Sequence, residues 1–328
     1  MSALQSPAPP VAPAPPRLQW VPCNLCGATD AAQLYPGTMD VTGEPFDPTE
    51  VFACTSSQYG RYGPVVRCRH CGLAYLNPRL SAEVVESAYE EVADTLYAQE
   101  REGRVHTFSR ALDELERVQR ATSDSPIARG RLLDVGCHIG VFLELALARG
   151  WAAEGVEPSQ WACDYARDRG LQVSCGMLRS QRFPSAAYDV VTLWDVVEHF
   201  PDPAAELREV HRLLRPDGLV GITTMNIDSL MARLLGPRWP WLMQMHLYYF
   251  SERTLSAMLE QCGFRVVGVA PHRRIVSVAY LCSRAAVWAP RPARLVQRAA
   301  ERLGIAERVV PVDLGDIFTI YARRNDES

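Results

Sequence analysis

The chain has 328 residues, of which 48% are hydrophobic and 22% are charged, and its formal net charge is −4. This length and composition are typical of a globular protein with one large domain and a smaller unit. The acidic balance provides no overall positive field that would attract nucleic acid. All 34 basic residues are arginine, which excludes chemistry that depends on a catalytic lysine.

Residues 1–17 consist mainly of proline, alanine and serine. We expect this segment to be disordered, because it contains too few large apolar side chains to form a core. It lacks the charged start and the apolar centre of a signal peptide, and no apolar run in the chain is long enough to cross a bilayer. These features predict a soluble, cytoplasmic protein.

Two Cys-x-x-Cys-Gly motifs mark the segment 18–80, which we interpret as a zinc-ribbon-like module. A turn of this kind directs two thiolates toward one metal ion, and the glycine permits the turn behind them. A closed set of four thiolates is structural, and in a cytosolic-looking chain such pairs indicate metal and not disulfides. The alternative is four unlinked reduced thiols. The predicted zinc ligands are Cys23, Cys26, Cys68 and Cys71.

The remainder of the chain divides into two further segments. Residues 81–125 show helical spacing of apolar residues and end in a linker signal, so we predict a helical linker or lid. From 126 to 325, strand and helix patterns alternate, which predicts an α/β domain with a parallel sheet. Within that domain lie an aromatic insertion at 225–250 and a basic segment at 271–310.

The stretch 131–140 carries the strongest ligand-binding signal. A short apolar run ends at Asp134, and Gly136 and Gly140 separate it from a predicted helix. A second strand ends at Glu157, and a carboxylate there can accept hydrogen bonds from both hydroxyls of a ribose. Ligands of open α/β sheets bind at these carboxyl ends. The glycine spacing differs from the Gly-x-Gly-x-x-Gly of a dinucleotide site.

On these motifs the chain resembles the class I S-adenosylmethionine (SAM)-dependent methyltransferases. The run 188–199 and the turn at 213–219 follow in the order typical of that family. The resemblance covers about residues 125–325. It implies an α/β fold with a Rossmann-like, seven-stranded methyltransferase sheet that ends in a reversed β-hairpin. It also implies that the protein is an enzyme with SAM as its cofactor.

The same resemblance implies that the first turn holds the methionine part of SAM and that Glu157 holds its ribose. Met177 and Leu178 stand where the family often has an acid for adenine, and we expect them to pack against its ring. His138 is either a cofactor contact or a solvent-facing residue, and Tyr89 either closes over SAM or packs between helices. The predicted cofactor residues are Asp134, Gly136, Cys137, His138, Gly140, Glu157, Pro158, Met177, Leu178, Trp194 and Tyr89.

Asp195, Glu198 and His199 follow the fourth predicted strand, beside the expected position of the methyl group, and His246 lies in the aromatic insertion that covers the active site in this family. The predicted catalytic residues are His246, Asp195 and His199. An imidazole titrates near neutral pH, so we assign His246 as general base, with a loop-fixing role as the alternative. For His199 a structural role is favoured over a catalytic one. The aromatic insertion forms either a wall of the substrate pocket or part of the core. Its aromatic residues include Trp239, Trp241, Tyr248 and Tyr249.

These features predict methyl transfer to a small-molecule acceptor, such as a sugar, a glycolipid or a natural-product intermediate. By resemblance, the zinc module helps to form the substrate pocket. An RNA methyltransferase with a zinc ribbon is a rival, although the acidic balance makes nucleic acid the less favoured partner. A third reading is a SAM-binding protein without catalysis.

A fourth reading, an enzyme for a lipid-linked acceptor at a membrane surface, depends on the segment 271–310. This segment carries eight arginines and two glutamates. Arg294, Arg298 and Arg302 share one helical face with Leu295 and Leu303 beside them. Such a helix either rests on an anionic membrane, binds a diphosphate or forms a solvated face.

Overall fold

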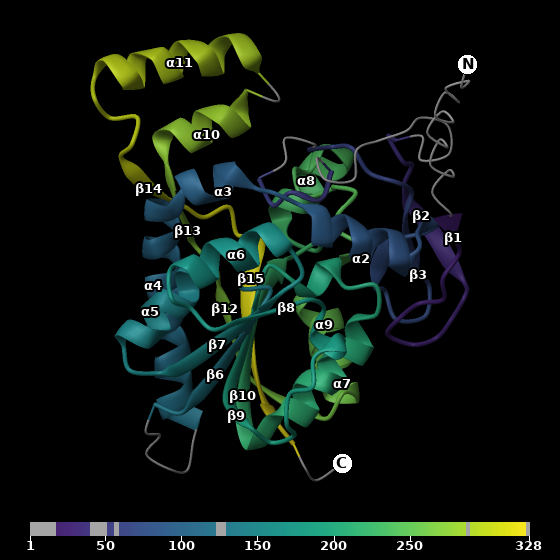
Figure 1. The fold of residues 1–328 in the computed structure, drawn as a ribbon. Coiled ribbons are helices and arrows are strands. Elements are labelled where there is room, and N and C mark those ends of the chain that lie inside the picture. The colour runs from purple at the N-terminus through teal and green to yellow at the C-terminus, as the bar shows by residue number, and fades with distance from the viewer. Residues whose placement is uncertain (1–17, 40–50, 56–58, 123–128, 287–288, 326–328) are drawn as a thin grey trace, which may run out of the picture.

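The computed structural model describes residues 18–39, 51–55, 59–122, 129–286 and 289–325 (Figure 1). The tail 1–17, which we expected to be disordered, lies outside these residues. The end of the predicted linker, at 123–125, also lies outside them.

A seven-stranded sheet forms the centre of the molecule (Figure 1). The strands follow the order β12-β15-β10-β9-β6-β7-β8. Strand β15 is antiparallel to both β10 and β12, and the remaining pairs are parallel. The predicted Rossmann-like sheet with its reversed C-terminal hairpin is therefore confirmed. Its strands are β6 (Arg131–Val135), β7 (Ala152–Glu157), β8 (Val173–Cys175), β9 (Tyr188–Trp194), β10 (Leu214–Met225), β12 (Phe264–Pro271) and β15 (Ile317–Arg324).

Helices cover both faces of this sheet (Figure 1). One face carries α4 (Arg101–Thr122), α5 (Val141–Ala148) and α6 (Gln160–Asp168), and the other carries α7 (Pro203–Leu213) and α9 (Glu252–Gln261). The side chains of Asp202 and Ser251 accept hydrogen bonds from backbone amides of the first turns of α7 and α9. These caps define where the two helices begin.

The N-terminal segment forms a small antiparallel sheet that a strand of the α/β domain completes. Strands β2 (Ala31–Tyr35), β3 (Val65–Cys68) and β4 (Ala74–Leu76) pair in this order, and β11 (Tyr248–Tyr249) pairs with β4. A second pair joins β1 (Leu18–Gln19) and β5 (Arg79–Leu80). One hydrophobic core continues from this segment to the sheet face under α7 and α9. Because strand pairing and core both cross residue 80, the division into domains stays a proposal.

Shorter elements surround the carboxyl ends of the parallel strands. Helices α2 (Ala82–Glu91) and α3 (Thr95–Gln99) connect the N-terminal segment to α4, and α8 (Leu230–Leu235) lies in the aromatic insertion. Strands β13 (Arg274–Ser277) and β14 (Val309–Val312) pair and carry α10 (Val278–Ala285) and α11 (Pro290–Arg302), which project from the body (Figure 1). The sequence did not predict this strand pair. Among the described residues, no helix combines the length and the apolar character needed to span a membrane.

One pair of cysteines outside the two Cys-x-x-Cys motifs forms a disulfide that the sequence analysis did not predict. Cys163 in α6 and Cys175 at the end of β8 form a disulfide, with Cα atoms 6.0 Å apart. The helix packs back against the strands that flank it, and this proximity is not visible in the sequence pattern. The remaining cysteines are free.

Candidate functional site

A cavity of about 220 Å³ lies at the carboxyl ends of the parallel strands. All three predicted catalytic residues, Asp195, His199 and His246, line this cavity. Three predicted cofactor residues, Asp134, Cys137 and Gly140, do not line it. The predicted cofactor residues that do line it are Gly136, His138, Glu157, Pro158, Met177, Leu178, Trp194 and Tyr89.

Glu157 is held in place by backbone amides. Its Oε1 accepts a hydrogen bond of 2.9 Å from the amide of Ser159, and its Oε2 accepts one of 2.9 Å from the amide of His138. Burial raises the pKa of this carboxyl to about 7. Each carboxylate oxygen keeps further acceptor capacity toward the cavity, so the two oxygens can receive two ligand hydroxyls.

Asp134 lies beneath the cavity and is 2% exposed. The hydroxyl of Thr192 on β9 donates a 2.7 Å hydrogen bond to its Oδ1, and burial raises the pKa of Asp134 to about 8. Gly136 has a φ of +69°, and a Cβ atom there would lie 2.6 Å from a methyl of Val196. The turn above Asp134 therefore requires glycine at this position.

Two residues of the same turn serve packing. A Cβ atom on Gly155 would lie 2.4 Å from the sulfur of Cys137, which places this thiol in the core and not in the cavity. A Cβ atom on Gly140 would lie 2.2 Å from a methyl of Leu171, so this glycine allows α5 to begin close to its neighbours. Neither residue lines the cavity, and a contact of their backbone with the cofactor stays a prediction.

His138 is buried, so the solvent-facing alternative is wrong. Its imidazole stacks on the ring of Tyr97 in α3, with the ring centroids 3.7 Å apart. The guanidinium carbon of Arg104 lies 3.3 Å from the centroid of the same tyrosine. Burial lowers the pKa of His138 to about 3, so its imidazole is neutral. The start of α4 and the helix before it thus form a wall across from the cofactor turn.

The raised pKa of Glu157 predicts a pH-dependent stability of the SAM-free protein. Folding moves this pKa from about 4.5 to about 7. The folded state therefore holds the proton more tightly, and the free energy of unfolding falls as the pH rises through this window, by on the order of 2–3 kcal/mol. Glu157→Gln imitates the protonated form. In urea unfolding between pH 5 and pH 8, we expect a smaller loss of stability in this variant than in the wild type. Equal losses in both proteins would contradict the assignment.

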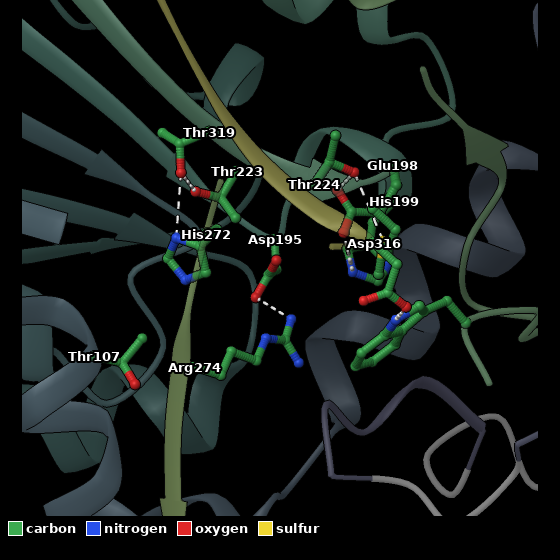
Figure 2. A network of polar contacts seen from close by, with 12 residues as sticks. Thr107, Asp195, Glu198, His199, Thr223, Thr224, His272, Arg274, Asp316 and Thr319 are labelled. Carbon is green, nitrogen blue, oxygen red and sulfur yellow. Dashed lines mark hydrogen bonds and ion pairs between the residues drawn. The ribbon is translucent and has the colours of Figure 1, made fainter. Parts of the chain in front are cut away.

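An ion pair that the sequence did not reveal lines the cavity (Figure 2). Asp195 has a φ of +56°, and its Oδ2 accepts a 2.6 Å hydrogen bond from Arg274 Nη2. The guanidinium carbon lies 4.6 Å from the ring centroid of Trp241. Arg274 belongs to β13, within the segment that we had interpreted only as a basic surface.

His272 also lines the cavity and was missed in the sequence. Its Nδ1 lies 3.2 Å from the hydroxyl of Thr319, which in turn is 2.8 Å from the hydroxyl of Thr223 (Figure 2). Strand β12 is antiparallel to β15, which is antiparallel to β10, and β10 is parallel to β9. Strand β12 therefore runs in the same direction as β9. Its carboxyl end therefore reaches the ligand-binding edge. The position of His272 just after the sixth predicted strand could therefore have identified it as a candidate site residue.

Two histidines and a glutamate gather at the same end of the cavity. Glu198 is fully buried, and the hydroxyl of Thr224 donates a 2.9 Å hydrogen bond to its Oε2. The Nδ1 of His199 lies 3.0 Å from the carbonyl oxygen of Met245 and 2.8 Å from the hydroxyl of Tyr89. The closure of Tyr89 over SAM stays a proposal.

His246 is 4% exposed, and its Nδ1 lies 2.7 Å from the carbonyl oxygen of Trp241. A carbonyl oxygen only accepts, so Nδ1 carries the proton and Nε2 keeps a lone pair. Burial lowers the pKa of both His246 and His199. Each imidazole is therefore neutral and has one nitrogen available for a proton or an ion.

The aromatic insertion contributes mainly to the core. Trp241 lines the cavity, whereas Trp239, Tyr248 and Tyr249 do not and are at most 2% exposed. The indole nitrogens of Trp239 and Trp241 both donate to Oδ2 of Asp316, at 3.0 and 2.9 Å. This shared acceptor fixes the part of the insertion around Trp239 and Trp241, and Trp241 lines the cavity.

The four predicted zinc ligands converge in the N-terminal segment. The sulfurs of Cys23 and Cys71 lie 3.4 Å apart, those of Cys26 and Cys68 lie 3.5 Å apart, and all four are within 4.8 Å of one another. In each motif the backbone amide of the glycine donates a hydrogen bond to the carbonyl oxygen of the first cysteine. The distance is 2.8 Å from Gly27 to Cys23 and 3.0 Å from Gly72 to Cys68. A set of four sulfurs in two such turns fits a tetrahedral zinc ion with a structural role.

The position of this cluster predicts how the loss of zinc would affect the protein. The side-chain amide of Asn24 donates a hydrogen bond to Asp202 at the start of α7. Strand β4 of the same segment pairs with β11, which begins just after His246. We expect Cys68→Ser to lose the bound zinc and to lower the unfolding midpoint by roughly 5–10 °C. Cys54→Ser should retain zinc and serves as the control. Zinc content by atomic absorption and thermal unfolding measure the effect. An unchanged zinc content in Cys68→Ser would contradict the site.

Comparisons with known proteins agree with this geometry. Residues 102–269, just over half of the chain, match a family described as a methyltransferase domain. The ubiquinone biosynthesis O-methyltransferase of Aeromonas salmonicida is 36% identical over 152 residues, which cover 42% of this chain and 63% of that protein. The enzyme of the same name from Thiobacillus denitrificans is 31% identical over 120 residues, covering 34% and 52%. The chain thus spans between half and two thirds of the length of these relatives.

Solved structures show a more distant likeness. A methyltransferase structure from Bacillus halodurans aligns with a TM-score of 0.46 at 15% identity and covers 65% of this chain and 99% of that chain. A SAM-dependent methyltransferase from Mesorhizobium loti aligns with a TM-score of 0.42 at 20% identity, covering 61% and 94%. At these scores the structures do not bear on function.

Proposed function

The chain belongs to the SAM-dependent methyltransferase family, and we propose that it methylates a hydroxyl group of a small-molecule acceptor. One observation carries the proposal. The carboxylate predicted to hold the ribose and the residues predicted to meet the acceptor line one cavity at the carboxyl ends of the sheet. The names of the relatives, which are O-methyltransferases of ubiquinone biosynthesis, support oxygen as the acceptor atom.

The acceptor is proposed to lie between Trp241 and the histidines. This part of the cavity offers an aromatic face, the sulfur-containing side chains of Met243 and Met245, and the ion pair of Asp195 with Arg274. A ring that bears hydroxyl groups suits these surroundings, because it can stack on the indole and donate to the carboxylate. Sugars and hydroxylated aromatic intermediates both belong to this class, and a glycolipid would place its sugar here.

SAM, when bound, supplies the methyl group as an electrophile. The chain's own residues orient and deprotonate the acceptor. Glu157 holds the ribose, and the turn at Gly136 allows the backbone to approach the ligand. With SAM bound, the acceptor oxygen would take the methyl group as the carbon–sulfur bond breaks, and Nε2 of His246 would accept the acceptor's proton. The proposed zinc ion holds the N-terminal segment against the insertion that carries this histidine.

Transfer of a labelled methyl group tests the proposal. The protein is incubated with labelled SAM and a cell extract, which is then separated into small molecules, lipids and RNA. We expect the label among small molecules, or among lipids that carry a hydroxylated ring. Label found only in RNA would replace the small-molecule acceptor by a nucleic acid. Tight SAM binding without any methyl transfer would indicate a SAM-binding protein that does not catalyse methyl transfer.

A lipid-linked acceptor is a second candidate, favoured by the surface of α11. This helix projects from the body (Figure 1). Leu295 on the helix and Leu303 directly after it are 70% and 73% exposed. Exposed arginines flank this apolar stripe at 291, 294, 298 and 302. An apolar face beside arginines suits the surface of an anionic membrane.

Flotation with liposomes checks this second candidate. We expect the protein to float with vesicles that contain an anionic phospholipid and to remain unbound with zwitterionic vesicles. Replacing Leu295 and Leu303 together with aspartate should reduce the bound fraction at least about tenfold, because it removes the apolar contact and adds repulsion. The variant's methyl transfer to a water-soluble acceptor serves as the folding control. Equal flotation of variant and wild type would rule out α11 as the contact.

A further inference from the structure

Glu198, His199 and His246 face one another across a small open space at the acceptor end of the cavity. One carboxylate oxygen and one nitrogen of each imidazole all lie within 4.8 Å of one another. The two imidazole centroids are 4.9 Å apart, and His199 Nε2 is 4.0 Å from Glu198 Oε1. The 4.0 Å separation is too long for a hydrogen bond. Figure 2 shows Glu198 and His199 close to Thr224.

Each of the three side chains is oriented by a contact on its far side. Thr224 holds Oε2 of Glu198, while backbone carbonyl oxygens of Met245 and Trp241 lie at hydrogen-bond distance from Nδ1 of His199 and His246. These carbonyl contacts place the protons on Nδ1 and direct the Nε2 lone pairs inward. Histidine ligands of metal ions show this arrangement, because the outer contact sets both the tautomer and the ring orientation.

The inward oxygen of Glu198 has no hydrogen-bond partner among the described residues. Glu198 is fully buried, and its Oε1 makes no hydrogen bond there. A buried carboxylate is costly unless a cation or hydrogen-bond donors compensate its charge. Neutral imidazoles that present lone pairs do not provide this compensation, whereas a cation at the centre would satisfy all three groups together.

We propose that Glu198, His199 and His246 bind a divalent transition-metal ion, separate from the proposed zinc at the four cysteines. Two imidazoles and one carboxylate form a ligand set suited to Zn²⁺, Fe²⁺ or Co²⁺, with positions left open for other ligands. The open side faces the cavity, where hydroxyl oxygens of the acceptor would complete the coordination. This assignment of the acceptor's position rests on the proposed function, but the metal site itself does not.

The proposal gives the lone pair of His246 a different use. A nitrogen that coordinates a metal ion does not accept a proton at the same time. The ion would lower the pKa of a hydroxyl bound to it, so that the hydroxyl loses its proton to solvent before methyl transfer and needs no proton acceptor at Nε2. An acceptor with two adjacent hydroxyl groups would fit this site best, because both oxygens can bind one ion.

Cobalt binding to the full, zinc-loaded chain tests the proposal. Co²⁺ is titrated by equilibrium dialysis and followed by its visible absorption, while the zinc content is measured in parallel. We expect the wild type to bind one Co²⁺ per chain beyond the cysteine-bound zinc. Glu198→Gln and His246→Asn should each weaken this binding by more than about 100-fold. Asparagine can still donate to the carbonyl of Trp241, and thermal unfolding shows that each variant is folded.

His272→Ala is the matched control, since this imidazole lines the same cavity but lies outside the cluster. It should bind Co²⁺ as the wild type does. The proposal is overturned if the wild type binds no Co²⁺ beyond the cysteines, or if both cluster variants bind it as tightly as the wild type does. Methyl transfer is measured separately. Cobalt binding without any transfer overturns the proposed function alone, and transfer without a second metal overturns the metal site alone.

Discussion

Replacing His246 with asparagine should lower methyl transfer by about 10²- to 10⁴-fold while the Kd for SAM stays within about twofold of the wild type. The imidazole lies on the acceptor side, with Nδ1 bonded to the carbonyl of Trp241 and Nε2 open to the cavity. Asparagine retains a donor for that carbonyl but has no group at the position of Nε2. The variant therefore separates a chemical role of His246 from a role in fixing the loop.

Single-turnover methyl transfer and SAM binding by calorimetry measure this effect. His106→Ala serves as the control, since this histidine lies on α4 and does not line the cavity. A loop-fixing role predicts that His246→Asn keeps most of its activity, and that result would overturn the assignment. A parallel loss of SAM affinity would move His246 to the cofactor site. The His246→Asn variant should lose the same activity whether His246 is a general base or a metal ligand. Only the metal content of the protein distinguishes these two roles.

Replacing Glu157 with alanine should weaken SAM binding by roughly 100-fold or more, because hydrogen bonds to a charged group contribute about 1.5–3 kcal/mol each. The backbone amides of His138 and Ser159 hold this carboxylate at the cavity wall, so it needs no rearrangement to meet two hydroxyls. Glu157→Gln keeps one acceptor oxygen and should show an intermediate affinity.

Glu154→Ala provides a matched control on the same strand. This carboxylate bonds Arg131 and Tyr188 and does not line the cavity. Its replacement should leave the Kd for SAM unchanged, as measured by calorimetry. A Glu157→Ala variant that binds SAM like the wild type would refute the ribose assignment. The loss should be the same for S-adenosylhomocysteine, since the two share the ribose.

The cofactor half of the candidate site was accessible from the sequence because it depends on local order. Strand, glycine turn and helix follow one another at 131–148, and Glu157 stands at the end of the next strand. Parallel strands place such ends at one edge. The sequence did not show which residues of the turn line the cavity, because a turn does not reveal which of its residues face inward. Cys137 and Gly140 belong to the turn but do not line the cavity.

The acceptor half depended on segments far apart in the chain. Arg274 reaches Asp195 across 79 residues, and β11 pairs with β4 although the two strands lie far apart in the sequence. The arginine-rich composition of 271–310 suggested only a surface helix. In the structure, Arg274 on β13, near the beginning of that segment, lines the cavity. Composition reports average character and does not record which residue of a segment is turned inward.

Local pattern was enough to predict the alternation of strands and helices, the four cysteines and the position of Glu157, whereas the reversed hairpin was implied by the resemblance to a known family. The shared strand and core of the N-terminal segment and the α/β domain became visible only in three dimensions. The same is true of the meeting of Glu198, His199 and His246, with one face open and the other held by backbone carbonyls and Thr224. Such convergence is set by packing between distant segments, and no local spacing encodes it.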